Sequence, residues 1–147
     1  MHPLSDFITG EGLAIPFPDK HFNKIYAIAS LHHISSKELR LKFLSEAKRA
    51  LKPGGLLIVA VWKFYEKKEI FFLLKYTLLE LLGMSKLNFY DIFEPRANKT
   101  ERYYHWFSKK ELENLVEQAG FKIIKFGIAR NEKVKRRNIF LVAEKSL

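Results

Sequence analysis

The sequence predicts an α/β fold organised as a single domain over residues 1–147. The first observation behind this prediction is a strand–helix–strand pattern between residues 24 and 62, where two nearly continuous apolar runs flank an amphipathic stretch. The second is a pair of apolar runs at 121–129 and 138–144 around a polar turn, which predicts two antiparallel strands. With 48% hydrophobic residues, a chain of 147 residues can enclose one core.

The first predicted elements are a short strand at residues 6–9, a loop at 12–21 and a strand at 24–31. The last of these, KIYAIASL, is almost continuously apolar, as expected for a strand buried on both faces. Ser35 or Ser36 is then placed to cap a helix. The apolar face of that helix is predicted from residues with helical spacing: Leu39, Phe43, Leu44, Ala47 and Leu51.

Glycine and proline predict where this helix ends. Pro53-Gly54-Gly55 follows it, and a glycine there can supply a left-handed C-terminal turn. Residues 56–62 predict a second buried strand, which a right-handed crossover would place parallel to the strand at 24–31. These three segments therefore predict a βαβ unit.

The remainder of the chain predicts a helix at 66–82 and a long loop at 84–105. Loops of this length inside a compact domain are more often functional than not. Ser108-x-x-Glu111 is a capping box, which predicts a helix ending before Gly120. The basic turn at 130–137 is either a phosphate contact or an ordinary solvated turn.

Composition narrows the class of protein. The formal net charge of +10 favours polyanionic partners, although a lysine-rich solvated surface explains the same charge equally well. The absence of cysteine excludes disulfides, thiolate zinc sites and cysteine nucleophiles. No signal-peptide pattern and no apolar run long enough to cross a bilayer is present, so we expect a cytoplasmic protein without a membrane segment.

Residues 12–62 have the pattern of the second half of a nucleotide-binding α/β domain. The glycine-rich turn that holds the cofactor in such domains has no counterpart upstream. Gly10-x-Gly12 does not replace it, because Pro16 follows and no helix begins there to present its N-terminus to a phosphate. No serine–histidine–acid arrangement and no pair of carboxylates at a catalytic spacing is evident.

Two motifs are candidates for a functional site. His32-His33 follows the strand at 24–31, at the sheet edge where open α/β folds bind ligands, and we expect at least one of these imidazoles to be functional. The alternative is that one histidine caps the strand end and the other is solvated. Few carboxylates lie near them, so no metal site is predicted.

The second motif is Arg102-Tyr103-Tyr104-His105-Trp106, which combines a cation with aromatic rings, as proteins that stack on unpaired bases do. The alternative is an ordinary aromatic core with a surface arginine. Extended backbone would send Tyr103 and His105 to one side and Tyr104 and Trp106 to the other, so part of the motif is expected in the core.

Taken together, these residues resemble a known family. GEGLAIPF at 10–17, KIYAIASLHH and LKPGGLLIVAVW resemble class I S-adenosylmethionine-dependent methyltransferases. The paired histidines, Trp62, RYYH at 102–105 and NIFLVAEK at 138–145 resemble the wobble-uridine tRNA carboxyl methyltransferases, which esterify 5-carboxymethyluridine with a small activator subunit. The resemblance covers nearly the whole chain, but only the later part of that family's domain.

The resemblance implies a partial Rossmann-like sheet. In the family the strand order is 3-2-1-4-5-7-6, so this chain would retain strands 4-5-7-6, with strand 7 antiparallel and strands 1 and 2 absent. The strand at 24–31 would then be an exposed apolar edge, which favours association. We expect it to be covered by a separate N-terminal half, by self-association, or by the chain's own N-terminal segment.

For the site, the resemblance implies S-adenosylmethionine as cofactor and tRNA as substrate, with a small activator subunit as a further partner. Glu11, Gly12 and Leu31 would lie on the cofactor side, and Arg102 and His33 would position a carboxylate or phosphate. Methyl transfer to a carboxylate needs no general base, since a carboxylate is already a nucleophile. The alternatives are a non-catalytic tRNA-binding or regulatory remnant, or a truncated product without activity. The substrate side would comprise His33, Arg102, Tyr103, Tyr104 and His105.

Overall fold

The computed structural model describes residues 6, 8–63, 74, 78, 81–82, 91–95, 101–130 and 137–146. The predicted helix at 66–82 therefore lies mostly outside the described residues. One helical hydrogen bond of it is described, from the amide of Leu82 to the carbonyl of Leu78 at 3.1 Å. Three side chains of the predicted basic turn, Lys133, Lys135 and Arg136, also lie outside them.

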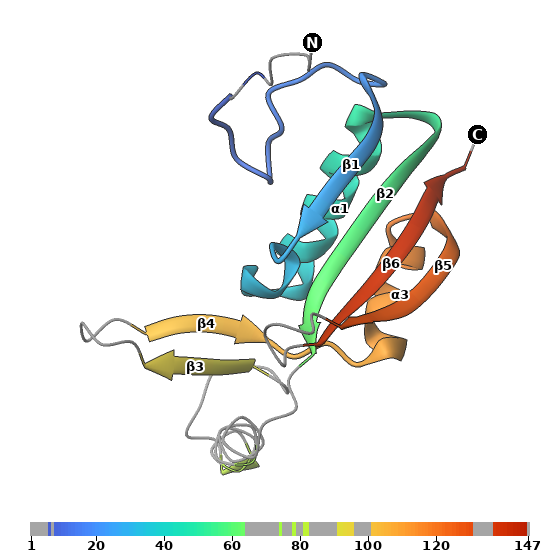
Figure 1. Cartoon of the computed structure of the whole chain (residues 1–147). Coiled ribbons are helices and arrows are strands. Elements are labelled where there is room, and N and C mark those ends of the chain that lie inside the picture. Colours follow the sequence, from blue (N-terminus) through green and yellow to red (C-terminus); the bar gives the residue numbers. More distant parts are fainter. Residues whose placement is uncertain are drawn as a thin grey trace.

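A four-stranded sheet forms the centre of the molecule, in the order β1-β2-β6-β5 (Figure 1). β1 runs parallel to β2, and β6 lies antiparallel to both β2 and β5. This is the predicted order 4-5-7-6 with an antiparallel strand 7, so the fold class is confirmed. The strands are β1 (Phe22–Ile28), β2 (Leu51–Lys63), β5 (Phe121–Arg130) and β6 (Arg137–Lys145).

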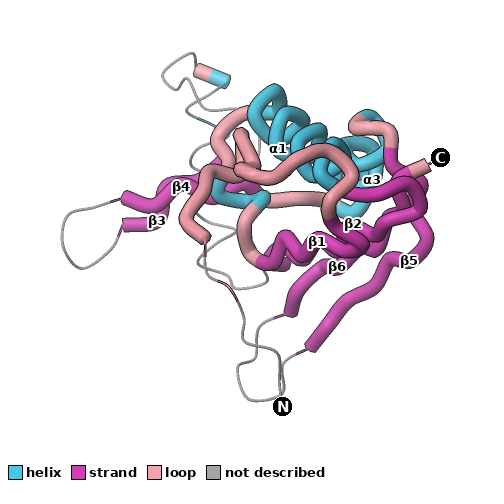
Figure 2. Tube along the Cα trace, turned by 90° about the horizontal axis from the view of Figure 1, so that it is seen from above, coloured by secondary structure: helices cyan, strands magenta, loops and turns pink. Residues whose placement is uncertain are grey.

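Two helices, α1 (Lys37–Ala50) and α3 (Lys109–Gln118), lie on the same face of this sheet (Figure 2). α1 is the crossover between the parallel strands, and α3 leads into β5. The core fills the space between these helices and the sheet, because every second residue of β2 and β6 points toward it. Its fully buried members include Leu44, Ala47, Leu57, Val59, Val61, Leu112, Val116 and Leu141.

The helix starts follow the predicted capping, but one helix end does not. The Oγ of Ser36 accepts a hydrogen bond from the amide of Leu39 at 3.2 Å, and the Oγ of Ser108 accepts one from the amide of Glu111 at 3.1 Å. α1, however, ends at Ala50, and the following residue, Leu51, already has extended backbone, so the prediction that a glycine closes this helix is wrong. Gly54 instead takes its φ of 71° within β2.

The predicted loop at 84–105 is also corrected. Its described residues form an antiparallel hairpin, β3 (Asp91–Pro95) with β4 (Glu101–His105), separate from the main sheet. The RYYH motif therefore lies on a strand. Residues 6 and 8–9, predicted as a strand, have no strand structure, and Leu31–His33 is a short 3-10 helix, η1, rather than the end of the strand at 24–31.

β1 is an edge strand, and it is not buried on both faces as predicted. Ala27 is 3% exposed beneath α1, whereas Tyr26 and Ile28 on the opposite face are 63% and 54% exposed. The described N-terminal residues do not cover this edge. They lie along α1, where the amide of Ile15 donates to Glu46 Oε2 at 3.0 Å.

Candidate functional site

An aromatic cluster, formed by His32, His33, Trp62 and Tyr104, lies at the carboxyl ends of the parallel strands β1 and β2. The two histidines belong to η1, Trp62 is the penultimate residue of β2, and Tyr104 is on β4. The rings of Trp62 and Tyr104 stack with centroids 5.4 Å apart, and those of His33 and Tyr104 lie 4.8 Å apart. Three segments that are distant in sequence therefore meet where open α/β sheets bind ligands.

His32 is the buried member of this cluster, with no exposed surface. Burial, and then the neighbouring His33, lower the pKa of His32 to about 3, so its imidazole is neutral at physiological pH. Neither ring nitrogen has a hydrogen-bond partner in the described part of the chain. Its ring packs against Trp62 with centroids 4.8 Å apart, so His32 supports the cluster rather than facing a ligand.

His33 is the accessible imidazole of the pair. Its Nδ1 lies 3.1 Å from the carbonyl oxygen of Tyr103, which can only accept, so Nδ1 carries the proton. In the neutral ring this leaves Nε2 as a hydrogen-bond acceptor. His33 can therefore accept from a base N–H or a ribose hydroxyl, and it would need a second proton to bind a carboxylate.

On the other side of β4, five polar side chains form a network: Arg40, Asp91 and His105 are buried, and Tyr103 and Glu111 are partly exposed. The Oδ1 of Asp91 accepts from the Tyr103 hydroxyl and lies next to His105 Nδ1, both at 2.6 Å. His105 Nε2 is 2.6 Å from Glu111 Oε1. Arg40 donates to the Tyr103 hydroxyl at 2.7 Å and to the carbonyl of Ile34 at 2.9 Å.

The protonation of this network follows from its geometry. Burial lowers the pKa of His105, but the hydrogen bonds to Asp91 and Glu111 outweigh this effect and raise its pKa overall. With a carboxylate at each nitrogen, His105 is an imidazolium that donates to both. Burial, followed by the hydrogen bond to Asp91, raises the pKa of Tyr103, which keeps its hydroxyl protonated. The charges of Arg40 and His105 thus balance those of the carboxylates Asp91 and Glu111.

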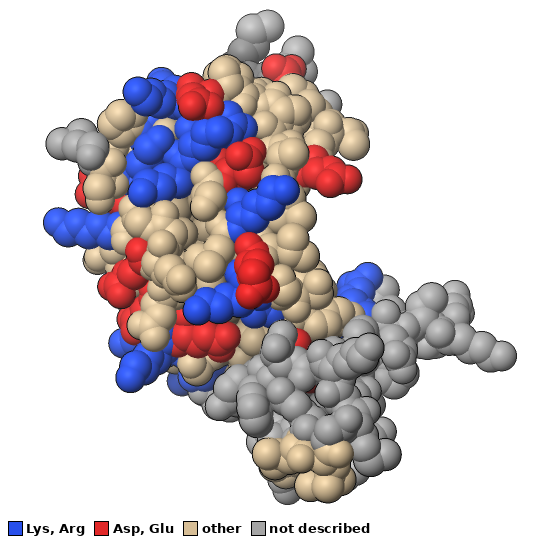
Figure 3. All heavy atoms as spheres, turned by 180° about the vertical axis from the view of Figure 1, so that it is seen from behind, with Lys and Arg blue, Asp and Glu red and all other residues tan. Residues whose placement is uncertain are grey.

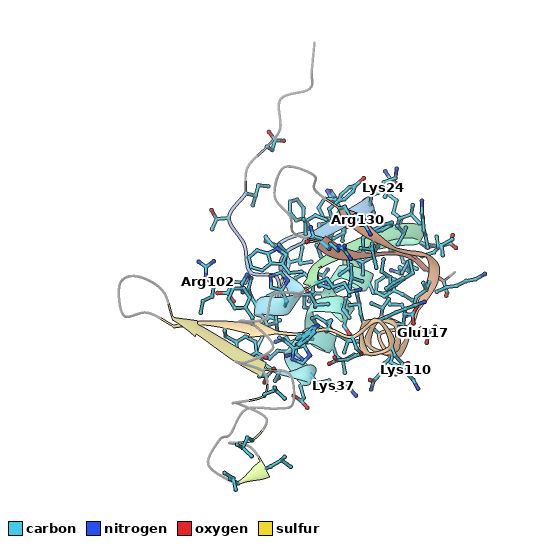
Figure 4. The ribbon with its side chains drawn as sticks, turned by 60° about the horizontal axis from the view of Figure 1, so that its bottom comes forward. Lys24, Lys37, Arg102, Lys110, Glu117 and Arg130 are labelled. Carbon is cyan, nitrogen blue, oxygen red and sulfur yellow. The ribbon has the colours of Figure 1, made fainter. Side chains whose placement is uncertain are left out.

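The alternation predicted along this motif is therefore confirmed for Tyr103, Tyr104 and His105, and the side taken by Trp106 stays a prediction. Tyr103 and His105 enter the polar network, and Tyr104, only 2% exposed, enters the aromatic cluster. Arg102 is exposed and projects from the hairpin (Figure 4). Arg40 and Asp91 were not predicted to be part of this site, because their separation from the motif along the chain hides their contact with it.

The three residues predicted for the cofactor side do not form a site by themselves. Glu11 is exposed, and its carbonyl accepts from the amide of Ala14 at 3.0 Å in a tight turn. A Cβ on Gly12 would lie 2.7 Å from the Phe43 ring, so a larger residue here would displace that ring. The side chain of Leu31 is completely buried in the core.

A cavity of about 550 Å³ lies between α1 and α3, next to His105. Its polar lining includes Lys37, Glu38 and Asn114, and Oε2 of Glu111 is buried there without a partner in the described part of the chain. Among the described residues no group of three potential ligands could hold a metal ion. No described helix is long and apolar enough to cross a membrane.

Comparison with known proteins identifies the fold. Residues 2–59 match the methyltransferase domain family. A solved S-adenosylmethionine-dependent methyltransferase from Methanosarcina mazei superimposes with a TM-score of 0.74 at 22% identity, over 94% of this chain and 66% of that protein. The chain has the fold of S-adenosylmethionine-dependent methyltransferases. Its βαβ unit, β1-α1-β2, falls largely within the matched residues.

Two further comparisons concern a curated relative and a solved complex. The tRNA (carboxymethyluridine(34)-5-O)-methyltransferase of Schizosaccharomyces pombe is 28% identical over 97% of this chain. A chain in the complex of the Haloferax volcanii Trm112 methyltransferase activator with a methyltransferase superimposes with a TM-score of 0.59 at 15% identity, over 96% of this chain and 62% of that chain. The present chain spans only 60–65% of the length of the curated relatives that match most of it.

Proposed function

We propose that this chain is the substrate-binding part of a tRNA methyltransferase that esterifies the carboxymethyl group of a wobble uridine. The observation that carries the proposal is the similarity to the Schizosaccharomyces pombe tRNA (carboxymethyluridine(34)-5-O)-methyltransferase over 97% of this chain, at 28% identity. The aromatic cluster supports it, because it lies where the methyltransferase fold binds ligands and carries rings suited to stacking.

In this proposal each accessible group has a separate task. The exposed Arg102 guanidinium pairs with the substrate carboxylate, for which its planar fork is matched. His33 accepts a hydrogen bond from the base or ribose through Nε2, as its contact with the Tyr103 carbonyl dictates. Trp62, which is partly exposed, lies beside the base, and the buried ring of Tyr104 supports it from behind. No general base is needed, since the carboxylate is itself the nucleophile; its orientation is what the chain supplies.

S-adenosylmethionine would supply the methyl group that the carboxylate accepts. We propose that Glu11, Gly12 and Leu31 supply only part of its binding site and that a complementing segment outside the described residues supplies the rest. A small activator subunit is a further proposed partner, supported by the fold similarity to the methyltransferase in the Haloferax volcanii Trm112 complex.

A non-catalytic tRNA-binding role is the second candidate, and basic charge favours it. Burial lowers the pKa of Lys145, and the nearby charges of Lys20 and Lys48 lower it further. The three lysines therefore lie close together. Figure 3 shows Lys and Arg side chains gathered on the helix-covered face. Such a cluster can bind phosphates without chemistry, and its affinity for RNA would fall steeply with salt.

Binding of two anticodon stem-loops separates these functions. The loops differ only in carrying 5-carboxymethyluridine or uridine at the wobble position, and fluorescence anisotropy reports their affinity for the 147-residue chain. We expect about tenfold tighter binding of the carboxymethyl loop, and loss of this preference in Arg102→Ala, since a charge-assisted pair contributes about 1.5–3 kcal/mol. Arg130→Ala, an exposed arginine on β5, is the control and should keep the preference.

Equal affinity of the wild-type chain for both loops would refute the proposed substrate. Tight but salt-sensitive binding of both loops would then favour the second candidate.

A further inference from the structure

Three lysines, Lys20, Lys48 and Lys145, form a lysine cluster at the end of the sheet opposite the aromatic cluster. β1 and β2 begin at this end, and α1 and β6 end there (Figure 1). Lys145 Nζ donates to the carbonyl of Leu51, the first residue of β2, at 2.7 Å. The amide of Lys20 donates to the carbonyl of Arg49 at 2.9 Å, which fixes the backbone of Lys20 against the end of α1.

The charges of the lysine cluster are not neutralised by the groups around them. None of the three lysines is in an ion pair within the described part of the chain. The nearby Asp19 is engaged by Arg49 at 2.7 Å. The end of α1 accounts for Lys48, since cations stabilise helix C-termini, but Lys20 precedes β1 and Lys145 lies on β6. The lysines therefore repel one another, and an anionic partner would relieve that repulsion.

An exposed aromatic ring adjoins these charges. His21 directly follows Lys20, and its exposed ring stacks on Phe17 with centroids 5.1 Å apart. The edge of Phe22 supports the same ring at 4.7 Å. Surfaces that bind single-stranded nucleic acid combine cations for the backbone with rings on which bases stack. An anionic lipid surface would use the lysines but not the ring, so the combination favours RNA.

The lysine cluster is too far from the substrate site to belong to it. β2 runs from Leu51, beside the cluster, to Trp62 in the aromatic cluster, and at about 3.3 Å per residue these positions are roughly 35 Å apart. Open α/β sheets bind their ligands at the carboxyl ends of the parallel strands, whereas the lysines lie at the amino ends. An RNA that reaches both surfaces must therefore extend well beyond one loop.

We propose that the lysine cluster and the ring of His21 form a second RNA-binding surface, which holds phosphates beside an unpaired base of the tRNA outside its anticodon loop. The choice of tRNA as the partner rests on the proposed function. The surface contributes affinity and orientation, because a tRNA held at both ends of the sheet presents its wobble base to the substrate site from one direction.

The test compares binding of the 147-residue chain to a full-length tRNA and to its isolated anticodon stem-loop, both with unmodified uridine at the wobble position. We expect the full-length tRNA to bind about tenfold tighter or more. Replacing both Lys20→Gln and Lys48→Gln should remove most of this difference. It should also lower the slope of log affinity against log salt by about 1.4–1.8 for the full-length tRNA, and leave the affinity for the stem-loop unchanged. Neither side chain is buried, so the variant should fold.

Stacking on His21 has a separate signature. His21→Ala should weaken binding of the full-length tRNA by about fivefold or more, because a stacked base contributes at least that much, and should leave the salt dependence as it is. His21→Phe should restore the affinity, since it keeps the ring.

The matched control replaces both Lys37→Gln and Lys110→Gln, two exposed lysines at the starts of α1 and α3 (Figure 4), and should keep the preference for full-length tRNA. Equal affinity of the wild-type chain for tRNA and stem-loop would overturn the inference, as would the same salt slope in both double variants. Lysine-dependent binding to phosphatidylserine vesicles without a preference for full-length tRNA would assign the surface to a lipid instead. Neither RNA carries the carboxymethyl group, so failure of the proposed substrate appears only in the earlier stem-loop comparison.

Discussion

Replacing Asp91 with asparagine should destabilise the fold by about 3–5 kcal/mol, the usual cost of breaking a buried ion pair by removing one partner. Asp91 is 2% exposed, and its Oδ1 receives the Tyr103 hydroxyl and lies against His105, both at 2.6 Å. Arg40 lies 3.6 Å from the same oxygen. Asparagine keeps the size of the side chain but leaves two buried cations, Arg40 and His105, with Glu111 as the one remaining carboxylate among the described members of the network.

Equilibrium unfolding in urea measures this difference, with Asp19→Asn as the control. Asp19 also pairs with an arginine, at 2.7 Å from Arg49, but it is 70% exposed, and exposed pairs contribute about 0–1 kcal/mol. Hydrogen exchange of β3 and β4 in Asp91→Asn should also accelerate, since the network is what joins this hairpin to α1 and α3. Equal unfolding free energies of the two variants would refute the assigned role of the network.

Two predictions concern pH. The pKa of His105 is raised in the folded chain. Its contribution to stability is therefore full below about pH 6.5 and is lost as the pH rises through the raised value. In the alkaline range, the urea midpoint should consequently fall less for His105→Gln than for the wild type. The contribution of His32 to stability changes with pH in the opposite direction. Its folded pKa of about 3 means that stability falls as the pH drops below about 6.5, by about 1.4 kcal/mol per pH unit, and His32→Phe should remove that part of the acid sensitivity. A midpoint-against-pH profile that is unchanged in either variant would contradict the corresponding assignment.

The sheet could be predicted from sequence because its signals are local. The apolar runs of β1 and β2 and the turn between β5 and β6 are visible within short windows, and the resemblance supplied their order. The hairpin of β3 and β4 was missed, because Asp91 and Arg102 lie in a stretch without hydrophobic period. The network that holds this hairpin depends on Arg40, which on a helix is indistinguishable in sequence from a solvated residue. Burial of Arg40 is a property of tertiary packing alone.

The side chains on the two sides of β4 have separate roles. Those on one side stabilise the hairpin, and those on the other contribute to the proposed substrate site. Tyr103 and His105 hold the hairpin to the helices, and Tyr104, the residue between them, extends to the opposite side and stacks on Trp62 with centroids 5.4 Å apart. The position of Tyr104 therefore depends on the network that its two neighbours in β4 form. Loosening that network should displace Tyr104 from Trp62 and move Arg102 with it. Weakened stem-loop binding in a folded Asp91→Asn variant would then reflect positioning, since Asp91 is too deeply buried to touch RNA.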